Sequence, residues 1–174
     1  LVLSLLEKQV GKRFDLPYNI IAIKGYDVII LRKKEDNSKD NNKSLPSINV
    51  QIPGDTPILQ GNKTLRTSLK PYKKGMIIPK EGYTKWFDYD KINNIISLRT
   101  RQEGDFIQIN SEGSRKKIKS LFIDEKIPKE NRDNIPLIAD GSHIIWILGG
   151  RISEAYKVSK NTKTILEMSL HGGN

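Results

Sequence analysis

Short apolar runs separated by turn residues dominate the pattern of this chain. Their length and their content of β-branched and aromatic side chains are typical of strands rather than of long helices. Strands are predicted at residues 19–23, 26–31, 48–52, 95–100, 136–139, 143–148, 151–158 and 164–170, with several short ones between 63 and 85. Lys24-Gly25 and Asp140-Gly141 are favourable turns, so the strands on either side of each pair are expected to form hairpins.

Helical patterns are short and few. Residues 1–10 are dense in apolar side chains up to Gly11, which predicts the helical tail of a preceding domain over 1–15. Pro128 suits the first turn of a short helix, PKENRD. The remaining pattern predicts an α+β fold, mainly β, in which residues 16–174 form one β-rich domain with a few short helices.

A third helix is predicted in the basic segment SRKKIKSLFI. Ser114 is a suitable N-cap for a helix over 114–123, in which Ile118, Leu121 and Phe122 share one buried face. Four of the first six residues of this segment are basic, although the helix dipole favours anions at an N-terminus. Basic residues at this position destabilise the helix locally, which suggests that they are present for another purpose, such as contact with phosphate.

Residues 32–47 contain a single aliphatic side chain among sixteen residues. Such a segment cannot bury enough apolar surface to offset the entropy of ordering, so a flexible loop is predicted. Two interpretations remain open, because the loop is either a basic arm that orders on RNA or a tolerated insertion.

The charge balance favours an anionic partner. Thirty Lys and Arg residues stand against twenty Asp and Glu, giving a formal net charge of +10. Cationic surfaces bind polyanions by releasing condensed counterions. The alternative is that the excess of basic residues has no role in binding, because the whole proteome is basic or because an acidic domain outside this chain offsets the charge. The longest apolar run, 144–148, is too short to span a bilayer, and no signal peptide is evident. A cytoplasmic protein without a membrane partner is therefore expected, and a start other than Met suggests an excised fragment.

Two sets of basic residues are candidate phosphate contacts. Arg99 and Arg101 share one face of a predicted strand, where they either hold adjacent phosphates or pair with Glu103 and Asp105. Seven cations between residues 63 and 85 form either a second polyanion surface or a solvated face. Further along the chain, Arg132 and Asp133 are positioned for an internal ion pair.

Catalytic and metal sites find little support in the residues. Asp88 and Asp90 are read as turn-capping or ion-pairing groups rather than paired catalytic carboxylates. Asp140, Ser142 and His143 lie in one hairpin turn, where triad geometry is unattainable. The absence of cysteine excludes disulfides, thiolate zinc sites and Cys nucleophiles, and two distant histidines do not argue for a metal site. The chain has no phosphate-binding glycine loop and no aromatic RNP motif.

Three long segments carry a family resemblance. The runs LRTRQEGDF, KKIKSLFIDEKIPKENRD and IPLIADGSHIIWILGGRIS, supported by WFDYDK upstream, resemble the C-terminal domain of tRNA(Ile)-lysidine synthetase, most clearly over 86–158. One departure is the segment IQINSEG, where the family often has a loop with proline and glycine. The resemblance implies a sandwich-like sheet core similar to part of the phenylalanyl-tRNA synthetase β chain.

The resemblance also implies an activity for a longer protein. This family uses ATP, with magnesium, to ligate lysine to the first anticodon cytidine of an isoleucine tRNA, in an N-terminal PP-loop domain with an SGGxDS-type motif. This chain has no such motif, so no cofactor is expected in it and it should be inactive alone. Its expected partners are the acceptor stem and body of the tRNA and the enzyme's own catalytic domain. The candidate RNA contacts are Arg99, Arg101, Arg115, Lys116, Lys117, Lys119, Lys126 and Arg132. The alternative is a structural docking or homodimerisation domain whose basic surface is incidental.

Overall fold

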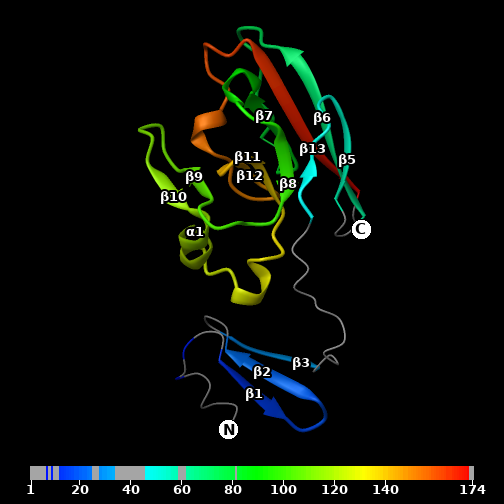
Figure 1. The fold of residues 1–174 in the computed structure, drawn as a ribbon, viewed down its shortest axis with the longest axis vertical. Helices are drawn as coiled ribbons and strands as arrows, with labels where there is room; N and C mark the ends of the chain where they lie inside the picture. The colour runs from blue at the N-terminus through cyan, green and yellow to red at the C-terminus, as the bar shows by residue number, and fades with distance from the viewer. Residues whose placement is uncertain are drawn as a thin grey trace.

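Strands form most of the regular structure of the protein, in three sheets (Figure 1). The computed structural model describes residues 7, 9, 12–24, 28–33, 46–58, 62–80 and 82–172. Strands β1 (Arg13–Leu16), β2 (Ile20–Lys24) and β3 (Ile29–Lys33) form an antiparallel meander. The hairpin predicted around residues 24–25 is thereby confirmed. Most of the predicted helical tail and of the loop 32–47 lies outside the described residues.

The central sheet has six strands in the order β10-β9-β12-β11-β8-β4. Its neighbours are antiparallel except for β12 and β9, which are joined in parallel. The predicted hairpin of β11 and β12 is confirmed, with Gly141 at a φ of 61° in the turn. The strands are β4 (Ile48–Asn49), β8 (Ile96–Arg99), β9 (Phe106–Gln108), β10 (Arg115–Lys117), β11 (Leu137–Asp140) and β12 (His143–Ile147).

The third sheet has the order β5-β6-β13-β7, formed by β5 (Gly54–Ile58), β6 (Lys63–Pro71), β7 (Thr84–Asp88) and β13 (Thr164–Gly172). Strands β6 and β7 are both antiparallel to β13, so they run parallel to each other and their connection crosses β13. The prediction of several short strands between 63 and 85 was wrong for its first part. There the full-length pairing with β13 sustains one nine-residue strand, β6.

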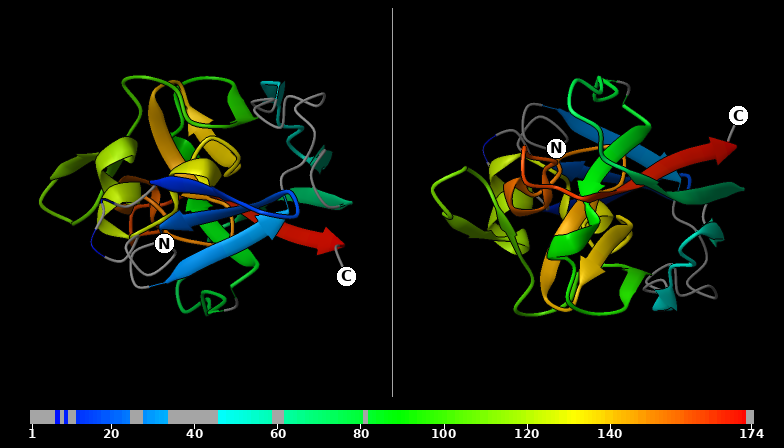
Figure 2. Two further views of the ribbon diagram at one scale, coloured as in Figure 1. Left: turned by 90° about the horizontal axis from the view of Figure 1, so that it is seen from below. Right: turned by 90° about the horizontal axis from the view of Figure 1, so that it is seen from above.

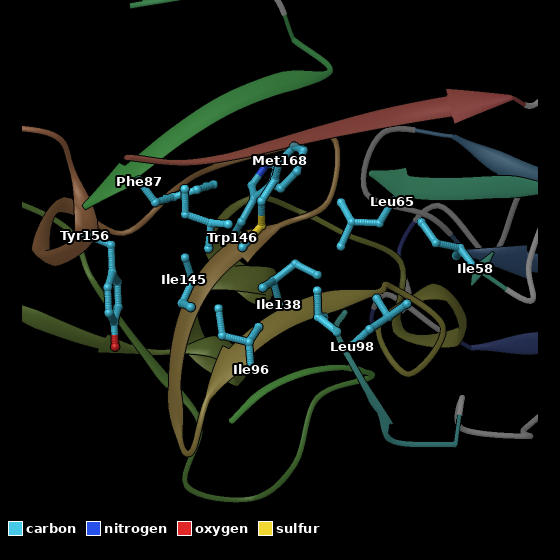
Figure 3. Close-up of a cluster of buried hydrophobic side chains, with 12 residues drawn as sticks. Ile58, Leu65, Phe87, Ile96, Leu98, Ile138, Ile145, Trp146, Tyr156 and Met168 are labelled. Carbon is cyan, nitrogen blue, oxygen red and sulfur yellow. The ribbon is translucent and has the colours of Figure 1, made fainter. Parts of the chain in front are cut away.

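The main hydrophobic core lies between the six-stranded and four-stranded sheets (Figure 3). Leu65, Phe87 and Met168 meet Leu98 and Trp146 there, all of them buried. The ring centroids of Phe87 and Trp146 are 6.1 Å apart. This packing of two sheets confirms the sandwich-like, mainly β fold, and it confirms Trp146 as a core residue.

A second core lies where helix α1 (Ile118–Asp124) packs near the strands of the six-stranded sheet. The predicted stripe of Ile118, Leu121 and Phe122 is confirmed as buried in it. All four residues of β11 are buried: Leu137 and Ala139 enter the second core, Ile138 enters the main core, and Asp140 is enclosed by hydrogen-bond donors. Within the described residues, no helix has the length and apolar character needed to cross a membrane.

The start of the predicted helix was wrong. Residues 115–117 form strand β10, which pairs antiparallel with β9, and α1 begins only at Ile118. Ser114 is not its N-cap, because Ser114 and Asn110 exchange two hydrogen bonds in the loop between β9 and β10. Strand pairing, a nonlocal interaction, therefore overrides the local capping signal.

The last strand before β13 was also predicted wrongly. In place of a strand over 151–158, the structure has two isolated bridges, from Ile152 to Trp146 and from Lys157 to Phe87, and a 3-10 helix at Glu154–Tyr156 between them. This turn brings the hydroxyl of Tyr156 to Asp140, to which it donates a hydrogen bond of 3.0 Å.

The short helix predicted to begin at Pro128 is a 3-10 helix, Lys129–Asn131.

Asp140, at the end of β11, joins three segments. It accepts hydrogen bonds from the backbone N–H groups of Asn93 and Asn94, from the Asn94 side chain and from Tyr156. Burial alone would raise the pKa of Asp140, but these donors outweigh it and hold the pKa below its usual value. Asp140 therefore fixes the β11–β12 turn to the loop before β8 and to the turn at Tyr156.

We expect Asp140→Asn to lower the free energy of unfolding near neutral pH by about 2–3 kcal/mol, because an amide places N–H groups against N–H donors. The folded pKa is depressed, so the stabilisation is present above the unfolded value near 3.9 and is lost as the pH falls through the folded value. Urea unfolding between about pH 3 and pH 7 should show the wild-type advantage shrinking in acid. Glu112→Gln, an exposed carboxylate in a turn, is the matched control, and a pH-independent difference for Asp140→Asn would contradict the prediction.

Candidate nucleic-acid interface

Arg99 lies inside the protein, with only 5% of its side chain exposed. Its two terminal nitrogens donate to the carboxylate of Asp105 at 2.7 and 2.8 Å, and they also reach the carbonyls of Thr100 and Gly141. The structure therefore selects the ion-pair interpretation of Arg99. This correction removes Arg99 from the surface available to RNA, because its guanidinium is enclosed by protein acceptors.

Arg101 and Arg132 are partly exposed and are both engaged. Arg101, which follows β8, pairs with Asp133 at 2.6 Å. Asp133 is the carboxylate that the sequence suggested as the partner of Arg132. Arg132 donates from Nε to the carbonyl of Ile127 at 2.8 Å. Both arginines thus tie the 128–133 turn to its surroundings, and their positive charge reaches solvent only in part.

The exposed cations gather where β10 meets α1. Arg115 and Lys117 share one face of β10, and Lys119 follows in the first turn of α1. All three are exposed, and none has a carboxylate partner among the described residues. Both views of Figure 2, like Figure 1, place this corner on the opposite side of the protein from the end of β13. We call Arg115, Lys117 and Lys119 the β10–α1 cluster.

Lys116, between two members of the cluster, points elsewhere. It is half-buried and forms an ion pair with Asp124 at the other end of α1. Alternation along β10 explains this separation, since neighbouring strand residues face opposite sides. It also reduces the conflict with the helix dipole, because Arg115 and Lys116 belong to a strand, although Lys117 at the N-cap and Lys119 in the first turn still lie at the helix N-terminus.

Arg115 stacks on an aromatic group that sequence reasoning had not singled out. Its guanidinium carbon lies 4.7 Å from the ring centroid of Phe106 on the neighbouring strand β9. Phe106 in turn lies 4.6 Å from the ring of His143. Stacking restrains a long side chain, so Arg115 is held at the surface with less entropy to lose on binding. The pairing of Lys117 with Phe106 in the β9–β10 register was not visible in the sequence.

His143 contributes no additional positive charge near neutral pH. Burial and the nearby Arg115 lower the pKa of His143, and Asp140 opposes them only in part. Its Nε2 is hydrogen-bonded to the hydroxyl of Ser153 at 2.9 Å. Ser153 is fully buried and also accepts from the backbone of Gln108, so this pair supports the fold and offers no exposed nucleophile.

The second basic surface is partly neutralised on the sheet. Arg66 on β6 makes two hydrogen bonds of 2.9 Å to Asp55, and Lys70 pairs with Glu167 at 2.7 Å. Burial opposes ionisation of Glu167, but hydrogen bonds from Lys70 and Trp86 hold its pKa below the usual value. The exposed cations that remain are Lys63, Lys73, Lys74 and Lys80, which lie at the start of β6 and in the irregular 72–80 segment.

The carboxylates considered for catalysis have structural partners. Asp88 accepts from the backbone of Asp90 and from the hydroxyl of Thr162. Asp90 accepts from the backbone N–H groups of Lys163 and Thr164. The turn-capping interpretation is therefore confirmed. Across the ranges that the structure describes, no group of three or more His, Asp or Glu side chains is arranged to hold a metal ion.

Comparisons with known proteins give one consistent family. A family model described as "TilS substrate C-terminal domain" matches residues 96–169. The tRNA(Ile)-lysidine synthase of Caldanaerobacter subterraneus subsp. tengcongensis is 41% identical over 95% of this chain and 34% of its own length. That of Clostridium tetani is 42% identical over 98% of this chain and 36% of its own length. The chain thus spans about a third of the length of the curated relatives it matches.

A solved structure agrees in fold. The crystal structure of a TilS C-terminal domain superimposes with a TM-score of 0.61 at 21% identity. The match covers 74% of this chain and 98% of the other. At that identity the likeness establishes the arrangement of the strands, and the family relationship comes from the sequence matches.

We expect Arg99→Met to destabilise the chain by about 3–5 kcal/mol, because it leaves the carboxylate of Asp105 buried without its counter-ion. The double variant Arg99→Met/Asp105→Leu should recover most of this loss, since no buried charge remains. Unfolding in urea measures both. A double variant as unstable as the single one would show that the pair is not the source of the effect.

Proposed function

This chain belongs to the family of tRNA(Ile)-lysidine synthase C-terminal domains, and we propose that it is the noncatalytic tRNA-binding region of such an enzyme. The observation that carries the proposal is the β10–α1 cluster. Arg66 and Lys70 on β6, Arg99 at the end of β8 and Lys116 on β10 are matched by carboxylates, whereas these three lie on adjoining elements, exposed and without a carboxylate partner among the described residues. They lie on rigid elements, so their spacing is preserved before RNA arrives.

The proposed ligand is the backbone of a tRNA helix, at the acceptor stem and body of an isoleucine tRNA. Double-stranded RNA is recognised mainly through phosphates and 2′-hydroxyl groups, which requires cations in a fixed arrangement rather than a base code. Arg115, restrained by Phe106, is suited to bidentate contact with a phosphate, and Lys117 and Lys119 act as point charges beside it. Arg101 and Lys116, each paired with a carboxylate, and Arg132, bonded to a backbone carbonyl, supply weaker charge, and Lys126 stays a candidate contact.

We place the ligase chemistry in a part of the protein outside this chain. There ATP with magnesium would activate the first anticodon cytidine, and lysine would be joined to it. This chain's own contribution is to bind and orient the tRNA, and alone it should show no ligase activity. The proposed setting is the cytoplasm, with the enzyme's catalytic domain as the protein partner.

The alternative is a docking or homodimerisation domain whose cations are incidental. The apolar side chains on the β6–β7 connection favour it, because Ile77 is 86% exposed and Tyr83 is 65% exposed. The two functions differ in the property they require. RNA binding requires the charge of the β10–α1 cluster, whereas docking requires the apolar connection and is insensitive to that charge.

We expect Lys117→Ala/Lys119→Ala to weaken binding of an isoleucine tRNA transcript and to flatten its salt dependence. Each phosphate contact contributes about 0.7–0.9 to the slope of log affinity against log salt, so the slope should fall by up to about 2. Fluorescence anisotropy across a salt series measures both quantities. Arg115→Ala should add a further decrease, because it removes the restrained guanidinium.

Lys73→Ala/Lys74→Ala is the matched control, since it removes the same charge from exposed positions outside the cluster. This variant should retain most of the affinity and the steep slope. Equal losses in both variants would show that only net charge matters. Absence of binding by the wild-type chain at low salt would refute the proposed function.

A further inference from the structure

We propose that a pocket beside the start of β8 holds one unpaired base of the bound RNA, and that it selects a base with an exocyclic amino group. The inference rests on the proposed function and adds to it a site separate from the phosphate-binding cluster. The pocket has a volume of about 620 Å³, within the roughly 300–1,000 Å³ typical of ligand sites. It opens between residues 50–52 and 92–96.

Apolar side chains form much of the pocket wall. Ile52, Tyr89 and Ile92 line it while also packing against the main core, which fixes their positions. Ile95 lines it too and is 74% exposed, so its apolar side chain is open to a ligand. A flat ring bound here would contact aliphatic and aromatic groups, which is how proteins bind the faces of unstacked RNA bases.

Two amide side chains supply the polar part of the site. Asn94 donates from Nδ2 to Asp140 at 2.7 Å, and Asn93 donates from Nδ2 to the carbonyl of Lys91 at 3.2 Å. Because the partners are a carboxylate and a carbonyl, which only accept, the amide orientations are determined. Each side chain therefore has its carbonyl oxygen left to accept from a ligand.

The loop that carries both amides is held rigidly. The backbone N–H groups of Asn93 and Asn94 donate to Asp140 at 3.1 and 2.9 Å, and Asp140 is itself fixed by Tyr156. The charged form of Asp140 is the acceptor for all of them, consistent with its lowered pKa. The pocket is therefore preorganised, and binding need not order this loop.

A pair of acceptors discriminates among bases. Adenine and cytosine each present an amino group with two donor hydrogens, which the Asn93 and Asn94 oxygens can accept. Uracil presents one imino hydrogen between two carbonyl oxygens, which would face the amide oxygens unfavourably. Every tRNA ends in a single-stranded CCA segment, so its terminal bases are suitable ligands for such a site.

The first experiment compares the oligoribonucleotides ACCA and UUUU with the 174-residue chain. Both carry the same number of phosphates, so counterion release contributes equally and the bases decide the difference. NMR titration should show ACCA shifting the side-chain amide signals of Asn93 and Asn94, with an affinity at least fivefold above that of UUUU. Equal affinities, or shifts that leave these amides unchanged, would overturn the proposal.

Two variants test the site directly. Asn93→Ala removes one acceptor from an exposed side chain, and Ile95→Glu places an anion beside the incoming RNA; each should reduce ACCA affinity at least fivefold. Ile77→Glu is the matched control, because it adds the same charge at an aliphatic side chain that is 86% exposed on the β6–β7 connection. Retained amide dispersion in the NMR spectra verifies that each variant is folded.

The outcomes separate this inference from the proposed function. If the chain binds tRNA with the expected salt slope but ACCA does not reach Asn93 and Asn94, the base pocket is refuted and the tRNA-binding function remains. If ACCA binds at the pocket while the Lys117/Lys119 variant leaves tRNA binding unchanged, the phosphate surface is refuted and the pocket remains. Ile95→Glu and Ile77→Glu that weaken ACCA equally would also overturn the pocket.

Discussion

The buried pair of Arg99 and Asp105 connects more of the structure than any other polar contact described here. Arg99 ends β8, and its guanidinium reaches Asp105 just before β9 and the carbonyl of Gly141 in the β11–β12 turn. The backbone carbonyl of Asp105 accepts from Ile118, the first residue of α1. Four elements therefore meet at these two residues. An arrangement of this kind costs much desolvation, and it is favourable only because nearly every donor and acceptor in it is matched.

This pair also explains how the proposed RNA surface is held in place. The carbonyl of Asp105 sets where α1 begins, and Phe106, the next residue, pairs with Lys117 and stacks under Arg115. The exposed cluster is thus held against Phe106, the residue that directly follows the buried Asp105. An arginine enclosed by protein therefore supports the proposed surface, because it fixes the segment before β9, the strand against which β10 pairs.

Local patterns in the sequence were sufficient for the elements that depend on neighbouring residues. The β11–β12 hairpin follows from Asp140-Gly141, and the buried face of α1 follows from the spacing of Ile118, Leu121 and Phe122. Nonlocal pairing decided the rest. The length of β6 depends on β13, about a hundred residues away, and the strand character of 115–117 depends on β9. Arg99 and Arg101 show the same limit for the site. Their local sequence contexts are alike, and only the three-dimensional positions of Asp105 and Asp133 make Arg99 buried and Arg101 partly exposed.

Net charge is therefore a poor measure of the surface that this domain offers to RNA. The chain carries +10, yet Arg66, Lys70, Arg99, Arg101 and Lys116 are each compensated by a carboxylate within ion-pair distance. Compensation lowers the local potential around these five side chains, whereas the β10–α1 cluster brings three uncompensated cations together on two adjoining elements, which favours an anion there. Binding that is confined to one corner also leaves the opposite faces available for the rest of a longer protein. A domain with evenly spread charge would attract RNA in many orientations, whereas a local cluster of uncompensated cations favours the orientation that brings the RNA backbone against it. Under the proposed function, orienting the tRNA is the contribution that this domain would make to a reaction carried out elsewhere in a longer protein.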